Sequence, residues 1–139
     1  MDDCNFIDKV DLELKRAERY SVFVSLVVFD LSFLENHLGP GASSVVHSLS
    51  QEARRNVREI DVVSVMDGCK LVLLLPETPR QGAEIASRRV SEILRDRLSR
   101  DNSAAAEKII PLEMASYPDA AGARTIRDFL GDYLDRHRN

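Results

Sequence analysis

With 139 residues and a mass of 15.6 kDa, the chain has the length of one ordinary domain and can bury a hydrophobic core. Apolar residues make up 44% of the sequence and charged residues 30%, a composition that excludes an intrinsically disordered chain. The net charge of −4 provides no basic field for a nucleic acid, and no run reaches the ~18 apolar residues of a membrane helix. We therefore expect a protein that binds neither a nucleic acid nor a membrane.

The cysteine content indicates a reducing compartment. The two cysteines, Cys4 and Cys69, are too few for the disulfide framework of a secreted domain, and the acidic first ten residues are unlike a signal peptide. We therefore expect a cytoplasmic protein. Neither cysteine has a partner at metal-ligand spacing, and we interpret His37 and His47 as surface residues. The sequence thus predicts no metal and no cofactor.

The first half of the chain predicts a helix, a buried strand and a second helix. Apolar spacing is typical of an amphipathic helix over residues 5–20, and the nearly continuous apolar run over 22–31 suits a central strand. Asp30 lies at the carboxyl end of this strand, where α/β sheets bind ligands, but a carboxylate there is equally typical of a cap or turn. After a break at 39–41, residues 42–44 offer an N-cap for a helix that continues to about Arg58.

The second half begins with a predicted hairpin. Two β-rich runs, 61–66 and 71–75, flank Asp67-Gly68, a dipeptide typical of a two-residue hairpin turn. A helix over 82–98, a loop over 100–107, a strand over 108–117 that Pro111 makes an edge or bulged one, a loop over 119–123 and a helix over 125–137 follow. The order α-β-α-β-β-α-β-α predicts an α/β or α+β layered fold with helices on both faces of the sheet.

Arg58 and Asp61 form the only Arg-x-x-Asp in the chain, just before the hairpin. A guanidinium and a carboxylate at that position could form a binding device. An isolated pair of this kind is more often an exposed ion pair, which contributes about 0–1 kcal/mol and binds no ligand.

The order of elements and several short strings resemble the GGDEF family, the diguanylate cyclase domains of bacteria. The strings are LKRAERY (14–20), SLVVFD (25–30), LLLPET (73–78), GAEIA (82–86), ASYPD (115–119) and the terminal RN (138–139). Each string alone is weak, but their order and spacing make the resemblance specific. It implies one GGDEF-like domain over residues 1–139, with a central mixed sheet flanked by helices and a hairpin at the family signature. The family's leading segment is mostly missing, so we expect either a trimmed domain or a piece of a longer protein.

The departures from the family pattern imply a degenerate domain without cyclase activity. The signature falls on Asp67, Gly68, Cys69, Lys70 and Leu71. Cys69 and Lys70 replace acidic residues, although two-metal phosphoryl chemistry needs carboxylates to hold the cations. Asp30 matches the family's metal-binding aspartate, but the next family acid is Ser32 here, so Asp30 is interpreted as vestigial.

One further family motif keeps its distance from the signature. In active relatives, an Arg-x-x-Asp ends five residues before the signature and forms the inhibitory site for the product, cyclic di-GMP. Asp61 is likewise followed by five residues and then by Asp67, so Arg58 and Asp61 match this site. A further arginine of the family site falls at Arg88 or Arg89.

The resemblance therefore implies a non-catalytic cyclic di-GMP-binding effector in bacterial signal transduction. Ligand occupancy would regulate a protein partner or the association of the domain with itself as a homodimer. Two alternatives remain: a dimerisation or protein-interaction scaffold that binds no nucleotide, and a pseudoenzyme that holds GTP as an allosteric ligand.

Overall fold

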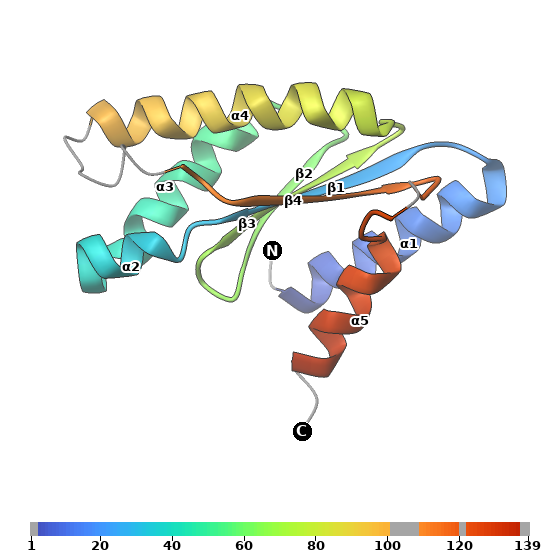
Figure 1. Ribbon diagram of the computed structural model, residues 1–139, viewed down its shortest axis with the longest axis horizontal. Coiled ribbons are helices and arrows are strands. Elements are labelled where there is room, and N and C mark those ends of the chain that lie inside the picture. Colours follow the sequence, from blue (N-terminus) through green and yellow to red (C-terminus); the bar gives the residue numbers. More distant parts are fainter. Residues whose placement is uncertain (1–2, 101–108, 120–121, 137–139) are drawn as a thin grey trace.

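The computed structural model of the protein describes residues 3–100, 109–119 and 122–136 (Figure 1). These residues form helices, one short 3-10 turn (η1) and strands. In chain order they are α1 (Asp3–Tyr20), β1 (Val24–Asp30), α2 (Phe33–Leu38), η1 (Gly39–Gly41), α3 (Ala42–Arg54), β2 (Val62–Met66), β3 (Lys70–Pro76), α4 (Arg80–Arg100), β4 (Leu112–Tyr117) and α5 (Ile126–Arg136).

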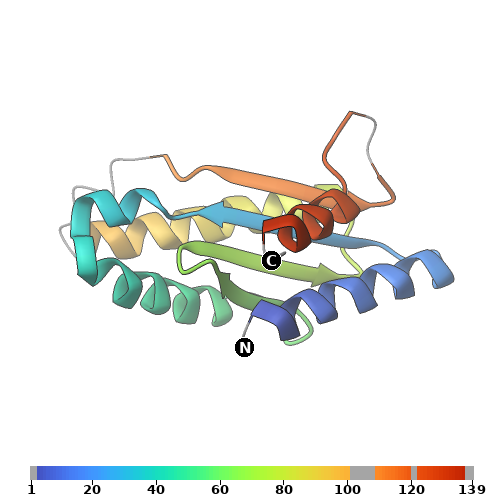
Figure 2. The ribbon, with the colours of Figure 1, turned by 90° about the horizontal axis from the view of Figure 1, so that it is seen from below.

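The four strands form one sheet in the order β2-β3-β1-β4, which Figure 2 shows side by side. All three strand pairings among the described residues are antiparallel. The expected α+β fold is confirmed, but the expected mixed sheet is wrong. The segment that contains α2 and α3 brings β2 into the sheet parallel to β1, yet β3 turns back and pairs between them, so the two parallel strands never meet.

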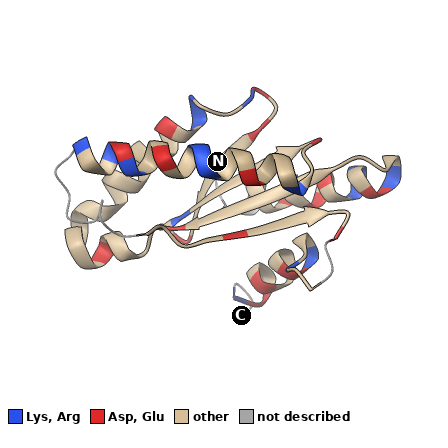
Figure 3. Cartoon of the chain, turned by 45° about the horizontal axis from the view of Figure 1, so that its top comes forward, with Lys and Arg blue, Asp and Glu red and all other residues tan. Residues whose placement is uncertain are grey.

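The sheet separates two hydrophobic cores because successive strand residues point to opposite faces. Val27 and Phe29 of β1 pack with α2, α3 and α4, whereas Leu26 and Val28 pack with α1 and α5. Figure 1 shows α4 on one side of the sheet and α1 and α5 on the other. Figure 3 shows that the charged residues lie mostly on the helices, where Lys and Arg are interspersed with Asp and Glu. The result is a three-layer arrangement of helices, sheet and helices.

Most predicted elements are confirmed, and the clearest differences lie around the second predicted helix. Helix α2 and the turn η1 occupy a stretch for which no element was expected. The N-cap of α3 is Gly41, so Ser43 and Ser44 lie inside the helix and do not cap it. Helix α3 ends at Arg54 rather than near residue 58. Asn56 lies just beyond that end, and its side-chain amide donates to the carbonyl of Glu52 (2.8 Å), competing with continuation of the helix.

The hairpin between β2 and β3 is confirmed, but its connection has three residues rather than two. Met66 pairs with Lys70, and the intervening Asp67 and Gly68 have positive φ values of 54° and 78°. The third residue, Cys69, accepts a hydrogen bond from the backbone N–H of Leu31 through its carbonyl (2.8 Å). The extra residue therefore ties the turn to the end of β1, which the dipeptide signal could not reveal.

Two expectations fall on segments outside the described residues. Arg100 ends α4, and the rest of the predicted loop over 100–107 is not among the described residues, nor is the terminal Arg138-Asn139. Within the described ranges, no helix combines the length and the apolar character needed to span a membrane.

Ser64 of β2 gives a stability prediction. Its side chain is 1% exposed, and its hydroxyl has no hydrogen-bond partner among the described residues. Because a buried, unpaired hydroxyl retains its desolvation cost, we expect Ser64→Ala to raise the free energy of unfolding by about 1 kcal/mol. Urea denaturation measures the change.

The matched control is Ser25→Ala in β1. Ser25 is equally buried, but its hydroxyl donates to the carbonyl of Thr78 (2.7 Å) and lies 2.9 Å from the hydroxyl of Ser116. This substitution should lower the stability, since it leaves buried polar groups without a partner. A loss of stability in Ser64→Ala as large as that in Ser25→Ala would contradict the prediction.

Candidate functional site

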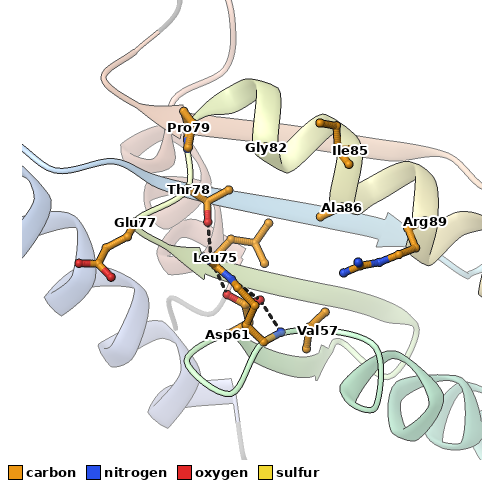
Figure 4. A pocket seen from close by; sticks show the side chains of 11 residues that line it. Val57, Asp61, Leu75, Glu77, Thr78, Pro79, Gly82, Ile85, Ala86 and Arg89 are labelled. Carbon is orange, nitrogen blue, oxygen red and sulfur yellow. Dashed lines mark hydrogen bonds and ion pairs between the residues drawn. The ribbon is translucent and has the colours of Figure 1, made fainter.

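A pocket of about 360 Å³ lies where three segments meet (Figure 4). The loop between α3 and β2 contributes Arg58 and Asp61, the end of β3 and the following loop contribute Glu77 and Thr78, and α4 contributes Arg89. The remaining lining residues are small or apolar: Val57, Leu75, Pro79, Gly82, Ile85 and Ala86. The pocket thus combines two guanidinium groups, two carboxylates and a largely apolar wall.

Arg58 and Asp61 form a tight two-point ion pair. Arg58 Nη2 donates to Asp61 Oδ1 (2.9 Å), and Arg58 Nε donates to Asp61 Oδ2 (3.2 Å). The backbone also closes this turn, because the N–H of Arg58 donates to Asp61 Oδ2 (2.9 Å) and the N–H of Asp61 donates to the carbonyl of Arg58 (3.0 Å). The Asp61 side chain is only 4% exposed, whereas that of Arg58 is 50% exposed. Asp61 is therefore the buried anchor, and Arg58 presents the accessible charge.

A second set of contacts holds the Arg58 guanidinium against the end of β3. Nη2 donates to the carbonyl of Pro76 (2.8 Å) and to the hydroxyl of Thr78. The hydrogen bond to Asp61 is the main cause that raises the pKa of Arg58 above its ordinary value, against a smaller lowering by burial. The guanidinium thus stays fully charged at any physiological pH.

Of the two arginines expected on α4, the structure brings Arg89 to the pocket and not Arg88. Arg89 lines the pocket, and its Nη2 donates to the backbone carbonyl of Asn56 (2.8 Å). Arg88 is exposed on another side of the helix and does not line the pocket. Arg58, Asp61 and Arg89 therefore share one site, as Figure 4 shows for Asp61 and Arg89.

Glu77 links the pocket to the opposite face of the sheet. Its backbone adopts a left-handed φ of 55°, uncommon for a residue with a Cβ. Its side chain lines the pocket, and Glu77 Oε1 lies 3.6 Å from Nη2 of Arg16 on α1. The pocket is thus connected to the first helix by an ion pair.

The signature residues lie at the hairpin turn, away from this pocket. Asp30 is opposite Lys70 in the pairing of β1 with β3, and Asp30 Oδ1 accepts a hydrogen bond from the backbone N–H of Ser32 (3.0 Å). Asp30 therefore has the turn-forming role that its sequence position also permitted. Asp67 Oδ2 lies 3.4 Å from Nη2 of Arg136, which ties the turn to α5.

Cys69 is a half-buried free thiol beside this turn. Burial is the main cause that raises its pKa, and the nearby carboxylates of Glu35 and Asp30 raise it further. The thiol therefore remains protonated at neutral pH and lacks the thiolate that a nucleophile needs.

A second hollow of about 400 Å³ lies between this turn and the start of α3. Its lining includes Glu35, Ser43, Gly68 and Cys69 around an apolar floor of Leu31, Ala42 and Val46. Lys70 and Asp30 do not line it. In the part of the chain that the structure describes, no group of three or more His, Cys, Asp or Glu side chains is arranged to hold a metal ion.

Sequence reasoning did not identify Glu77 or Thr78 as site residues. Both belong to the string LLLPET (73–78), which supported the family resemblance and was not interpreted as part of a site. A usable signal was present in the small and apolar residues Gly82, Ile85 and Ala86, whose spacing places them on the same side of a helix as Arg89. That stripe selects Arg89 over Arg88.

No protein-family model matches the sequence, and no curated protein matches it. Solved structures, however, share its fold. The GGDEF domain of YfiN (TpbB) from Pseudomonas aeruginosa is 16% identical and superposes with a TM-score of 0.65 over 99% of this chain and 90% of that one. The GGDEF domain of DgcB from Caulobacter crescentus, in complex with c-di-GMP, is 13% identical with a TM-score of 0.68 over 94% and 78%.

The third is the diguanylate cyclase SiaD from Pseudomonas aeruginosa, in complex with its activator SiaC. It is 18% identical, with a TM-score of 0.65 over 96% of this chain and 53% of that one. At these identities, the likeness establishes the fold and leaves the chemistry of the site to be argued from its residues.

Proposed function

Because the chain has the fold of GGDEF domains, we propose that it is a non-catalytic effector domain that binds cyclic di-GMP. One observation carries the proposal: Arg58, Asp61 and Arg89, which come from separate segments, line the same pocket. The volume of about 360 Å³ lies within the range of small-molecule sites.

The chemistry of the pocket suits a nucleotide with a flat base and a phosphate. A guanidinium can donate two parallel hydrogen bonds to the O6 and N7 edge of guanine or to phosphate oxygens. Arg58, whose side chain is 50% exposed, and Arg89 supply two charged donors, and Ile85, Pro79 and Ala86 offer an apolar wall for a base. Asp61 keeps the first guanidinium charged and oriented.

The signature end of the sheet supports the absence of cyclase activity. Diguanylate chemistry would require carboxylates to hold divalent cations against a triphosphate. Here Lys70 faces Asp30 across the two strands, and its positive charge opposes a cation at that position. Ser32 offers no carboxylate next to Asp30 and instead donates its backbone N–H to it.

We further propose that ligand occupancy is sensed by a protein partner or by a second copy of the chain. A ligand in the pocket would contact the loop before β2, the loop after β3 and helix α4 together. Ile85, which is 66% exposed, lies at the pocket, and Ile60, which is 49% exposed, lies next to Asp61 in the chain. These apolar side chains would border any surface that the bound ligand completes.

The geometry of the ion pair also favours one alternative, a protein-interaction scaffold that binds no nucleotide. Both oxygens of the buried Asp61 already accept hydrogen bonds, and Arg58 Nη2 is held by Pro76 and Thr78. The pair could therefore serve only to close the loop between α3 and β2.

Titration calorimetry with cyclic di-GMP, and with GTP and Mg²⁺ in parallel, separates these functions. We expect the protein to bind the dinucleotide. Arg89→Ala should weaken that binding about tenfold or more, since it removes a charged donor from the pocket. Arg88→Ala is the matched control: it removes a neighbouring arginine that does not line the pocket and should leave the affinity within about twofold.

The outcomes discriminate among the three functions. A protein that binds neither ligand would be a scaffold, and one that binds GTP but not cyclic di-GMP would be an allosteric pseudoenzyme. Formation of cyclic di-GMP from GTP and Mg²⁺ would overturn the non-catalytic assignment. Equal losses in Arg88→Ala and Arg89→Ala would place the ligand elsewhere.

A further inference from the structure

Thr78 is held in one orientation from three directions. Its hydroxyl donates to the carbonyl of Pro76 (2.9 Å), and its own backbone carbonyl accepts from the hydroxyl of Ser25 (2.7 Å). The hydroxyl of Ser25 on β1 in turn lies 2.9 Å from the hydroxyl of Ser116 on β4, so the loop after β3 is fixed to β1 and, through Ser25, to β4. The residue is 8% exposed.

The third constraint comes from Gly82 on α4. A Cβ at this position would lie only 3.0 Å from the Thr78 methyl carbon Cγ2 and 3.6 Å from Pro79. The absence of a side chain at Gly82 therefore leaves the space that the Thr78 methyl group fills. The methyl and the hydroxyl of a threonine share one Cβ, and the rotation about χ1 is stiff, so a shift of the methyl also moves the hydroxyl.

The orientation of the Thr78 hydroxyl determines what it can do for Arg58. A hydroxyl has one hydrogen, and Thr78 uses it on Pro76, so toward Arg58 it can only accept. Arg58 Nη2 has two hydrogens for three acceptors, namely Asp61 Oδ1, the Pro76 carbonyl and the Thr78 hydroxyl. Since Nε also bonds Asp61, Nη1 is the guanidinium nitrogen left for a ligand among the described contacts.

We propose that Thr78 is a positioning residue that fixes the Arg58 guanidinium for ligand binding and that Gly82 keeps Thr78 in place. The inference rests on the proposed function, because it names the residues that preset the cyclic di-GMP site. Asp61 and the Pro76 carbonyl hold the guanidinium along one edge, and Thr78 adds a contact from the loop after β3 that restricts its rotation. A guanidinium that is already fixed in the ligand-free protein loses little conformational entropy when the ligand binds.

The test compares three variants by calorimetric titration with cyclic di-GMP. Thr78→Val keeps the shape but places a methyl group against Nη2, and should weaken binding about tenfold. Thr78→Ser restores the hydroxyl and should bind within about threefold of the wild type. Thr125→Val, at the start of α5 and outside the pocket, is the matched control and should bind as the wild type does.

Gly82→Ala gives a readout that a merely structural role would not produce. The higher helix propensity of alanine offsets the cost of the close contact with Thr78, so the thermal midpoint should change little. The affinity should nevertheless fall, because the new Cβ displaces the Thr78 methyl and with it the hydroxyl. An affinity equal to that of the wild type would overturn the role of Gly82.

The spectrum of the ligand-free protein separates failure of this inference from failure of the proposed function. When the guanidinium is held, the Nη1 and Nη2 signals of Arg58 are separate in nitrogen-15 NMR, and they merge when it rotates freely. We expect separate signals in the wild type and in Thr78→Ser, and merged signals in Thr78→Val. Separate signals in Thr78→Val would overturn the inference, even in a protein that proves not to bind cyclic di-GMP.

Discussion

Replacing Arg58 with alanine is expected to weaken cyclic di-GMP binding about 100-fold or more while the domain stays folded. The guanidinium is half exposed, fully charged and fixed in the pocket. The side chain therefore loses little conformational entropy when a ligand bonds it. Loss of one or two charge-assisted hydrogen bonds, at about 1.5–3 kcal/mol each, corresponds to that change in affinity. Calorimetric titration measures the affinity, and circular dichroism checks the fold.

Two further variants isolate the chemistry of Arg58. Arg58→Ala leaves the buried carboxylate of Asp61 without its charged partner, which itself lowers stability. Arg58→Lys keeps a positive charge near Asp61 but loses the planar fork, so it should fold better than the alanine variant and still bind weakly. Arg55→Ala is the matched control, because Arg55 is 69% exposed, its side chain pairs among the described residues with Glu52 alone, and it does not line the pocket. Unchanged affinity in Arg58→Lys would contradict a ligand contact that needs the guanidinium.

The sequence could predict Arg58 and Asp61 as a pair because their contact is local. They lie three positions apart, and the backbone N–H of Arg58 donates to the Asp61 carboxylate within the same turn. The contribution of Thr78 could not be predicted in this way, since its contact with Arg58 spans 20 positions in the chain. It depends on β2 and β3 lying side by side, which brings the start of one strand to the end of the other.

The fold was predictable for elements with strong apolar periodicity. The prediction failed where an element is short or where local polar contacts determine its ends. The long helices α1 and α4 and the central strand β1 follow their apolar spacing. Helix α2 is only six residues long, has Gly39 as its C-cap and carries a single fully buried residue, Leu34, so it has almost no periodic signal. The order of the strands in the sheet could not be predicted either. Hydrophobic alternation along a strand shows which of its faces is buried, but it does not identify the neighbouring strand.

Replacing Phe29 with alanine is expected to have the largest effect on stability, a loss of about 3–5 kcal/mol in the free energy of unfolding. Phe29 is fully buried in the central strand, where it pairs with Leu71 on one side and with Leu112 on the other. Its side chain belongs to the core beneath α3 and α4, and the alanine variant would leave a cavity that a sheet held on both sides cannot close. Because small domains have only about 5–15 kcal/mol in total, the variant should unfold at markedly lower urea concentration.

Phe23→Ala provides the comparison, since Phe23 lies just before the same strand and is 48% exposed. Its removal takes little apolar area out of the core and should cost less than about 1 kcal/mol. The core around Phe29 also supports the pocket, because α4 carries Arg89 and packs on it through Ala83, Val90 and Leu94. We therefore expect Phe29→Ala, where it remains folded, to bind cyclic di-GMP more weakly than Phe23→Ala. Equal stability of the two variants would contradict the tight packing of Phe29 between its two neighbouring strands and against α3 and α4.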